Sequence, residues 1–149
     1  MSSFTSKLRV EPVGEKNWKL LQSFSYHVGT QHSRTIIKVP RGFITDFASI
    51  PQLVISILGL VSILTGDVYN NLWFVSLGVI AILASALLPD WGRWGKAAII
   101  HDYLYHTKQI SRKMSDLIFL EAMEVLGVSL VERYSMYYAV RLFGWIRWR

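Results

Sequence analysis

The sequence predicts an α+β fold in which a small N-terminal antiparallel β-hairpin or sheet packs on a three-helix C-terminal bundle. Apolar residues alternate between residues 18 and 28, and three segments with helical start and stop signals follow Trp94. A third observation adds an inserted hydrophobic helical hairpin, because residues 53–88 contain a single charged residue, Asp67. The chain has 149 residues, which fits one domain over residues 1–149.

The N-terminal third is predicted to form strands and a loop. Apolar residues occupy alternate positions from Trp18 to Val28, and the segment GTQHSR separates them from a second run, TIIKVPRGF. This pattern predicts two strands joined by a turn. The following stretch, VPRGFITDFASIP, contains Pro40, Gly42 and Pro51. It is predicted to be a rigid loop, and its one acidic residue is Asp46.

Two uncharged runs lie between residues 47 and 89, on either side of Asp67. The segment Leu72–Leu88 is entirely apolar or small and, with its uncharged flanks, reaches the roughly 20 residues of a transmembrane helix. We therefore expect a transmembrane helix there. The first run offers about 13 helical residues after Pro51, roughly 20 Å of helix, which is too short to cross a bilayer. A helical hairpin buried inside a larger assembly is the alternative interpretation.

Aromatic residues flank the second apolar run and also end the chain. Tryptophan rings are typical of membrane interfaces, and the last nine residues, RLFGWIRWR, interleave them with arginine, which pairs with lipid phosphate. The alternative is an amphipathic helix end that docks on its own domain. The predicted membrane-interface residues are Trp73, Trp91, Trp94, Trp145 and Trp148.

Composition narrows the possible functions. The chain has no cysteine, which excludes a disulfide scaffold, a thiolate nucleophile and a cysteine-based zinc site. Its net charge is +6, but the basic residues are scattered, so no specific nucleic-acid recognition is expected. With 52% hydrophobic and 17% charged residues, we expect part of the surface to meet lipid or a protein partner.

Three helices are predicted after Trp94. The first covers about Lys96 to His106. The second begins at Ser111 as N-cap and stops at Gly127. The third opens with SLVE, which has the Ser and Glu spacing of a capping box.

The segment KAAIIHDYLYHTKQISRKMSD places His101 and Asp102 in the first of these helices. Asp116 occupies the inward apolar stripe of the next helix. A buried carboxylate without a partner costs several kcal/mol, so something must compensate it. The candidates are His101, a tyrosine hydroxyl, Arg141, or a metal ion shared with Asp102 and Asp46.

We therefore expect Asp46, His101, Asp102 and Asp116 to converge in space. A structural tie between a histidine and an aspartate is the alternative to a reaction centre.

Four segments carry a resemblance to a known family: GFITDFASIP, KAAIIHDYLY, SRKMSDLIFLEAMEVLGV and MYYAVRLFGW, in that order. They resemble the domain-of-unknown-function family 1353, small proteins of bacteria and especially of tailed phages. The resemblance covers about residues 8–52 and 87–145. It implies a family domain into which about 30 residues, roughly 56–85, have been inserted as a hydrophobic hairpin. It implies no established activity.

A fainter resemblance is to the phospholipases A2, whose core helix has a His-Asp pair followed by an aromatic residue. It implies His101 as the base, Asp102 as a cation ligand and Asp116 as the acid that orients His101. The cysteines and the calcium loop of those enzymes are absent here. Asp46 would have to replace the missing ligands, with calcium the most plausible divalent cation.

Two functional hypotheses follow. The first is a phage-associated structural, ejection or membrane-interacting protein, in which the His-Asp-Asp cluster is only a tie. Its partners would be membrane lipid or other virion subunits, and it would be membrane-associated in the infected cell or lie within the phage particle. The alternative is a membrane-associated, metal-dependent hydrolase of lipid or cell-envelope substrates. It would use His101 and Asp116 for catalysis, with a divalent cation on Asp46 and Asp102.

Overall fold

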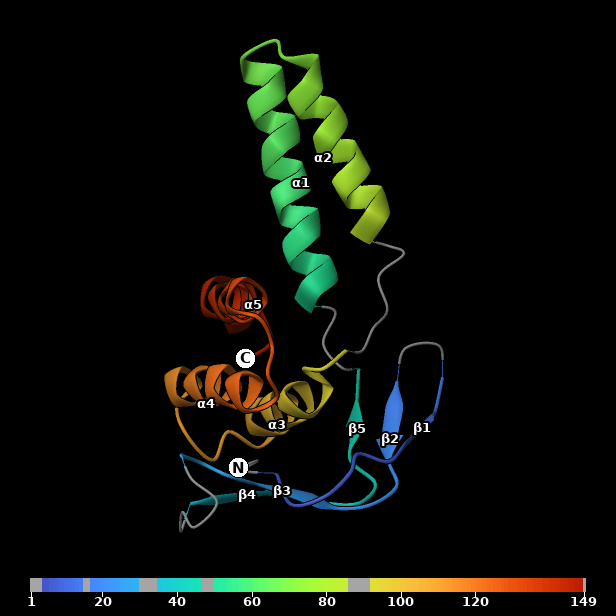
Figure 1. Cartoon of the computed structure of the whole chain (residues 1–149), viewed down its shortest axis with the longest axis vertical. Coiled ribbons are helices and arrows are strands. Elements are labelled where there is room, and N and C mark those ends of the chain that lie inside the picture. Colours follow the sequence, from blue (N-terminus) through green and yellow to red (C-terminus); the bar gives the residue numbers. More distant parts are fainter. Residues whose placement is uncertain (1–3, 15–16, 30–34, 47–49, 86–91, 149) are drawn as a thin grey trace. The chain divides into compact units, whose positions relative to one another are not determined.

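The computed structural model describes residues 4–14, 17–29, 35–46, 50–85 and 92–148 (Figure 1). The chain divides into two compact units, one formed by residues 1–48 and 90–149 and the other by residues 49–89. Antiparallel strands precede the helices along the chain. The predicted α+β fold class is confirmed.

The strands of the first unit are short and form two antiparallel sheets. One contains β1 (Val10–Pro12), β2 (Trp18–Leu20) and β5 (Ile44–Thr45), in the order β1-β2-β5. The other pairs β3 (Phe24–His27) with β4 (Ile36–Val39). Strand β5 lies within the segment that was predicted to be only a loop. It pairs there with β2. A strand of two residues is too short for its sequence to indicate its pairing partner.

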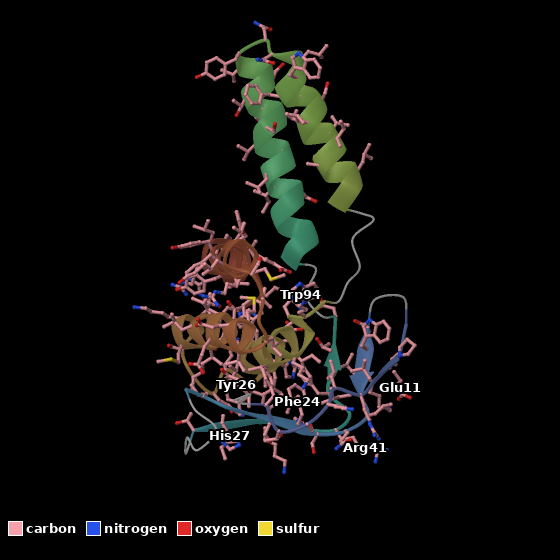
Figure 2. The ribbon with its side chains drawn as sticks, in the orientation of Figure 1. Glu11, Phe24, Tyr26, His27, Arg41 and Trp94 are labelled. Carbon is pink, nitrogen blue, oxygen red and sulfur yellow. The ribbon has the colours of Figure 1, made fainter. Side chains whose placement is uncertain are left out.

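Residues of β3 form one side of the core. Phe24 and Tyr26 lie on one face of the strand and His27 on the other, as Figure 2 shows. The Tyr26 side chain is fully buried, and its hydroxyl donates a hydrogen bond of 2.5 Å to Glu121 Oε1. The same carboxylate oxygen accepts a hydrogen bond of 2.6 Å from the backbone N–H of Gly29. Through Glu121, these bonds attach the β3-β4 pair to a helix.

Three helices complete this unit: α3 (Gly95–Thr107), α4 (Arg112–Val125) and α5 (Leu130–Phe143), followed by the 3-10 turn η1 (Gly144–Ile146). The predicted starts of two helices are confirmed. Ser111 Oγ accepts from the N–H of Met114, and Ser129 Oγ accepts from the N–H of Glu132, both at 3.3 Å. Helix α4 ends before Gly127, whose φ of +70° is easily adopted by glycine.

The second unit is a helical hairpin of α1 (Ile50–Val68) and α2 (Leu72–Ser85). Glycines let the two backbones approach closely. A Cβ added to Gly59 would lie 2.7 Å from Ile82 Cγ1 and 2.8 Å from the Gly78 carbonyl oxygen. The chain turns at Asn70, whose φ is +47°.

The prediction of a transmembrane helix is wrong. Within the residues that the structure describes, no helix is long and apolar enough to cross a bilayer. Helix α2 has 14 residues, or about 21 Å at 1.5 Å per residue, whereas the hydrocarbon core is about 30 Å thick. Helix α1 has 19 residues, but Asp67 lies in its last turn.

Candidate functional site

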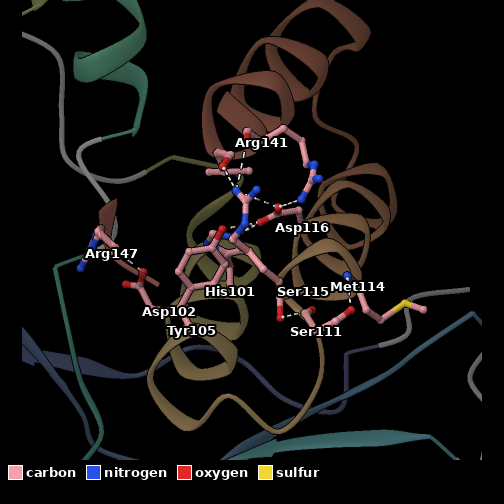
Figure 3. Close-up of polar contacts among 11 residues, drawn as sticks. His101, Asp102, Tyr105, Ser111, Met114, Ser115, Asp116, Arg141 and Arg147 are labelled. Carbon is pink, nitrogen blue, oxygen red and sulfur yellow. Dashed lines mark hydrogen bonds and ion pairs between the residues drawn. The ribbon is translucent and has the colours of Figure 1, made fainter. Parts of the chain in front are cut away.

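The carboxylate of Asp116 lies in α4 at the meeting point of three helices and is fully buried (Figure 3). Its Oδ1 lies 2.9 Å from His101 Nε2 and accepts a hydrogen bond of 2.6 Å from the Tyr105 hydroxyl, both on α3. Its Oδ2 accepts a hydrogen bond of 2.6 Å from Arg141 Nη1 on α5. We call these four side chains the buried tie.

The buried tie is closed to solvent on the histidine side. His101 is 3% exposed, and its ring lies between Tyr105 and Phe119, with centroid distances of 4.1 and 4.7 Å. Arg112 adds a second link between α4 and α5, because its Nη1 donates to the carbonyl oxygens of Val140 and Arg141 at 3.3 and 3.1 Å. In the part of the chain that the structure describes, neighbouring side chains therefore cover the His101 ring against a substrate.

The electrostatics of the buried tie favour an ionised Asp116 beside a neutral His101. Burial lowers the pKa of His101, and the hydrogen bond to Asp116 opposes this without reversing it. Burial would raise the pKa of Asp116, but hydrogen bonds from His101, Tyr105 and Arg141 outweigh it, and that pKa is lowered. The neutral imidazole therefore acts as an Nε2–H donor, and the positive charge comes from Arg141.

A second polar group lies one residue further along α3. Asp102 Oδ2 accepts a hydrogen bond of 2.6 Å from Thr45 Oγ1, and the carboxyl groups of Asp102 and Asp46 are hydrogen-bonded to each other. Arg147 forms an ion pair with Asp46 at 3.2 Å and lies 4.0 Å from Asp102 Oδ1. We call Asp46 and Asp102 the acid pair.

The acid pair opens into a cavity of about 450 Å³, within the usual range of ligand pockets. Burial and the negative charge of Asp46 raise the pKa of Asp102 to about 7, although its hydrogen bond with Thr45 opposes the shift. At neutral pH Asp102 is thus about half protonated. The cavity is lined by Asn17, Gly42, Phe43, Ile44, Thr45, Asp46, Asp102, His106 and Arg147.

The four residues predicted to converge lie in these two groups. His101 and Asp116 belong to the buried tie, and Asp46 and Asp102 form the acid pair. Sequence reasoning missed Thr45, His106 and Arg147. Thr45 directly precedes Asp46 and His106 lies four residues after Asp102, so both could have been found from spacing, whereas Arg147 was assigned to a lipid interface.

The predicted metal site is wrong. Among the described residues, no group of three or more histidine, cysteine, aspartate or glutamate side chains is placed to hold a metal ion. Calcium needs six to eight oxygen ligands. The oxygens of Asp46 and Asp102 are instead engaged with each other, with Thr45 and with Arg147, so the residues present do not fit calcium.

The tryptophans predicted at a membrane interface have different environments. Trp73 is 81% exposed and Trp145 is 51% exposed, whereas Trp94 is buried in the core. The Trp148 ring packs edge-on against Tyr105, with 4.9 Å between centroids. Trp91 lies outside the described residues. Their interface role stays a prediction, and exposure favours it for Trp73 and Trp145.

Fold and site define a small α+β protein with a hydrogen-bonded acid pair in a cavity lined by both polar and apolar residues. The chain belongs to the family described as Protein of unknown function (DUF1353), whose model matches residues 18–65 and 74–140. No curated protein and no solved structure shows significant similarity to it. The match includes Asp46, His101, Asp102 and Asp116, and its interruption, residues 66–73, is shorter than the expected insertion, which stays a prediction.

Replacing Asp116 with asparagine should destabilise the protein by about 3–5 kcal/mol at neutral pH, because it removes the charge that Arg141 compensates and the acceptor of His101 and Tyr105. Since the pKa of Asp116 is lowered by folding, its contribution should be lost as pH falls through the folded-state pKa. Thermal and urea unfolding measure both effects. The matched control is Glu124→Gln, which breaks an ion pair between Arg133 and a glutamate side chain that is 63% exposed, and it should cost less than about 1 kcal/mol. Equal losses in the two variants would contradict the buried tie.

Asp102→Asn should have the opposite effect on stability. Because folding raises the pKa of Asp102, the folded state holds a proton that the unfolded state releases, and stability falls as pH rises from about 4 to about 7. Asparagine can keep the hydrogen bonds to Thr45 and Asp46 without that cost. The variant should therefore have a higher melting temperature than the wild type at pH 8 and a similar one at pH 4. A difference that does not change with pH would refute the raised pKa.

Proposed function

We propose that the protein is a hydrolase that uses the acid pair for general acid and base catalysis on an ester or amide of a lipid or cell-envelope molecule. The observation that supports this best is the acid pair itself, two hydrogen-bonded carboxyl groups in a cavity, one with a pKa of about 7. Two neighbouring carboxyl groups that share one proton can supply an acid and a base at the same pH.

The roles within the acid pair follow from the neighbours of each carboxyl group. Asp46 is ion-paired with Arg147 at 3.2 Å, so we assign Asp46 as the base that takes a proton from the attacking water. Asp102, with the raised pKa, is the acid that gives its proton to the substrate. The water oxygen bonds to the carbonyl carbon, and Arg147 stabilises the negative charge that develops on the carbonyl oxygen. The bond from that carbon to the ester oxygen or amide nitrogen then breaks, and the Asp102 proton passes to this leaving atom, so that an acid and an alcohol or amine are released.

This assignment moves the base away from His101. In the phospholipase-like interpretation His101 activates water, but here its ring is 3% exposed and its Nε2 is engaged with Asp116. We assign His101 and Asp116 a positioning role instead. They fix the helix that presents Asp102.

A second candidate function is a structural, ejection or membrane-interacting component of a phage particle, with the hairpin as an insertion into the family domain. The specific observation in its favour is the large number of exposed apolar side chains on α1 and α2. In that case the protein would lie within the particle or at a membrane of the infected cell. Mass spectrometry of purified phage particles should then detect the chain at a fixed copy number. Its absence would remove this candidate.

The hydrolase proposal predicts that the purified chain cleaves chromogenic esters or anilides faster than buffer alone. Cleavage should decline as pH rises through about 7, because Asp102 then loses the proton that it must donate. Asp102→Asn and Asp46→Asn should each lower kcat/KM by about 10²–10⁴-fold. Glu11→Gln, which alters an exposed ion pair with Lys19, should leave kcat/KM unchanged. Cleavage that persists in both aspartate variants would contradict the proposal.

A further inference from the structure

The helical hairpin has an inner seam, where its two helices contact each other, and two outward faces, whose residues differ from those of the seam. At the seam, Gly59 faces Ile82 and Gly78, and Ser62 Oγ donates a hydrogen bond of 2.8 Å to the carbonyl oxygen of Phe74. Small residues of both helices thus lie in the seam. The outward faces are what remains for any further contact.

These outward faces are apolar where a helix in water normally has charged residues. Thirteen large apolar side chains of the described hairpin are between 44% and 81% exposed. They occur on both helices and in the turn between them, so the apolar surface is not confined to one helix. They are Leu58, Leu60, Val61, Leu64, Val68, Tyr69, Leu72, Trp73, Phe74, Leu77, Val79, Ile80 and Leu83.

The area of this surface is sufficient for a stable protein interface. A buried aromatic side chain covers about 150–250 Å², so the exposed fractions of Tyr69, Trp73 and Phe74 alone amount to roughly 400 Å². Ten exposed aliphatic side chains add to it. A stable complex needs about 800 Å² per partner, and monomers rarely leave an apolar patch of that size in water.

The tip of the hairpin argues for a protein occupant rather than hydrocarbon. Asp67 and Asn70 are exposed there, and a carboxylate at the bilayer centre costs about 2.5–3.5 kcal/mol on insertion scales. A partner that packs along the sides of α1 and α2 leaves this polar tip in water.

Charge indicates which protein would fit. Residues 53–88 contain one acidic and no basic residue, whereas the rest of the chain has 16 basic and 9 acidic residues. Two copies meeting through their basic units would repel each other. Two copies meeting along their hairpins bring together the least charged surfaces of the molecule, and four such helices can bury one another in a bundle.

We propose that the outward faces of α1 and α2 bind the same hairpin of a second copy, so that the protein is a homodimer joined by a four-helix bundle. This inference does not depend on the hydrolase proposal, because the acid pair lies wholly in the other unit.

The first test is the oligomeric state of the full-length chain by light scattering coupled to gel filtration. The wild type should be a dimer, and the double variant Leu64→Glu, Ile80→Glu should be a monomer with unchanged helix content by circular dichroism. The matched control is Leu130→Glu, Val131→Glu on α5, where the leucine and the valine are 62% and 80% exposed. It should stay dimeric. A monomeric wild type, or a dimer in the hairpin variant, overturns the proposal.

The second test uses the absence of cysteine from the chain. Leu60→Cys, on the outward face, should form a disulfide-linked dimer under mild oxidation. Ile63→Cys, which faces Gly78 across the seam, should not. Lack of cross-linking at both positions overturns the proposal. So does a monomer that co-sediments with phosphatidylglycerol vesicles and loses this binding in the Leu64→Glu, Ile80→Glu variant, which would identify lipid as the occupant.

Discussion

Asp116 places a carboxylate at the point where three helices meet, and an unpaired charge there would cost several kcal/mol. Helix α3 contributes hydrogen bonds to this carboxylate from His101 and Tyr105, and α5 contributes one from Arg141. Hydrogen bonds are directional, so they constrain the rotation and the height of each helix in a way that apolar contacts alone do not. The packing of this unit is therefore specified by one charge and its donors.

This constraint also positions the acid pair. Successive residues on a helix point about 100° apart, so an inward His101 leaves Asp102 to face β5, where Thr45 donates to it. The pKa values of two aspartates in the same fold are therefore shifted in opposite directions. Asp116 has donors and an arginine and its pKa is lowered, whereas burial beside Asp46 raises the pKa of Asp102. Environment rather than residue type separates a structural carboxylate from a chemically adaptable one.

The helices of the hairpin are held together by a different kind of interaction. Its two helices are held by close packing at glycines, and the described part of its seam has no charged pair. Apolar packing of this kind tolerates many partners and fixes orientation weakly. The chain thus combines a unit whose geometry is set by polar contacts with one whose outer surface is apolar.

The sequence by itself determined the fold class, the starts of α4 and α5 and the apolar hairpin segment, because these depend on local periodicity and capping. It also indicated that Asp116 needs a partner and included His101, Tyr and Arg141 among the candidates. It could not separate His101 from Asp102 as members of different groups, or show that α2 is too short to cross a bilayer. Strands of two to four residues have too little periodicity to be read, so tertiary structure decided β5 and the division of the predicted Trp18–Val28 strand into β2 and β3, which lie in different sheets. The same holds for Arg147, which lies 101 positions after Asp46 and meets it only because the fold returns the C-terminal segment to β5. Long-range contacts of this kind leave no local pattern, since they depend on the packing of the whole unit.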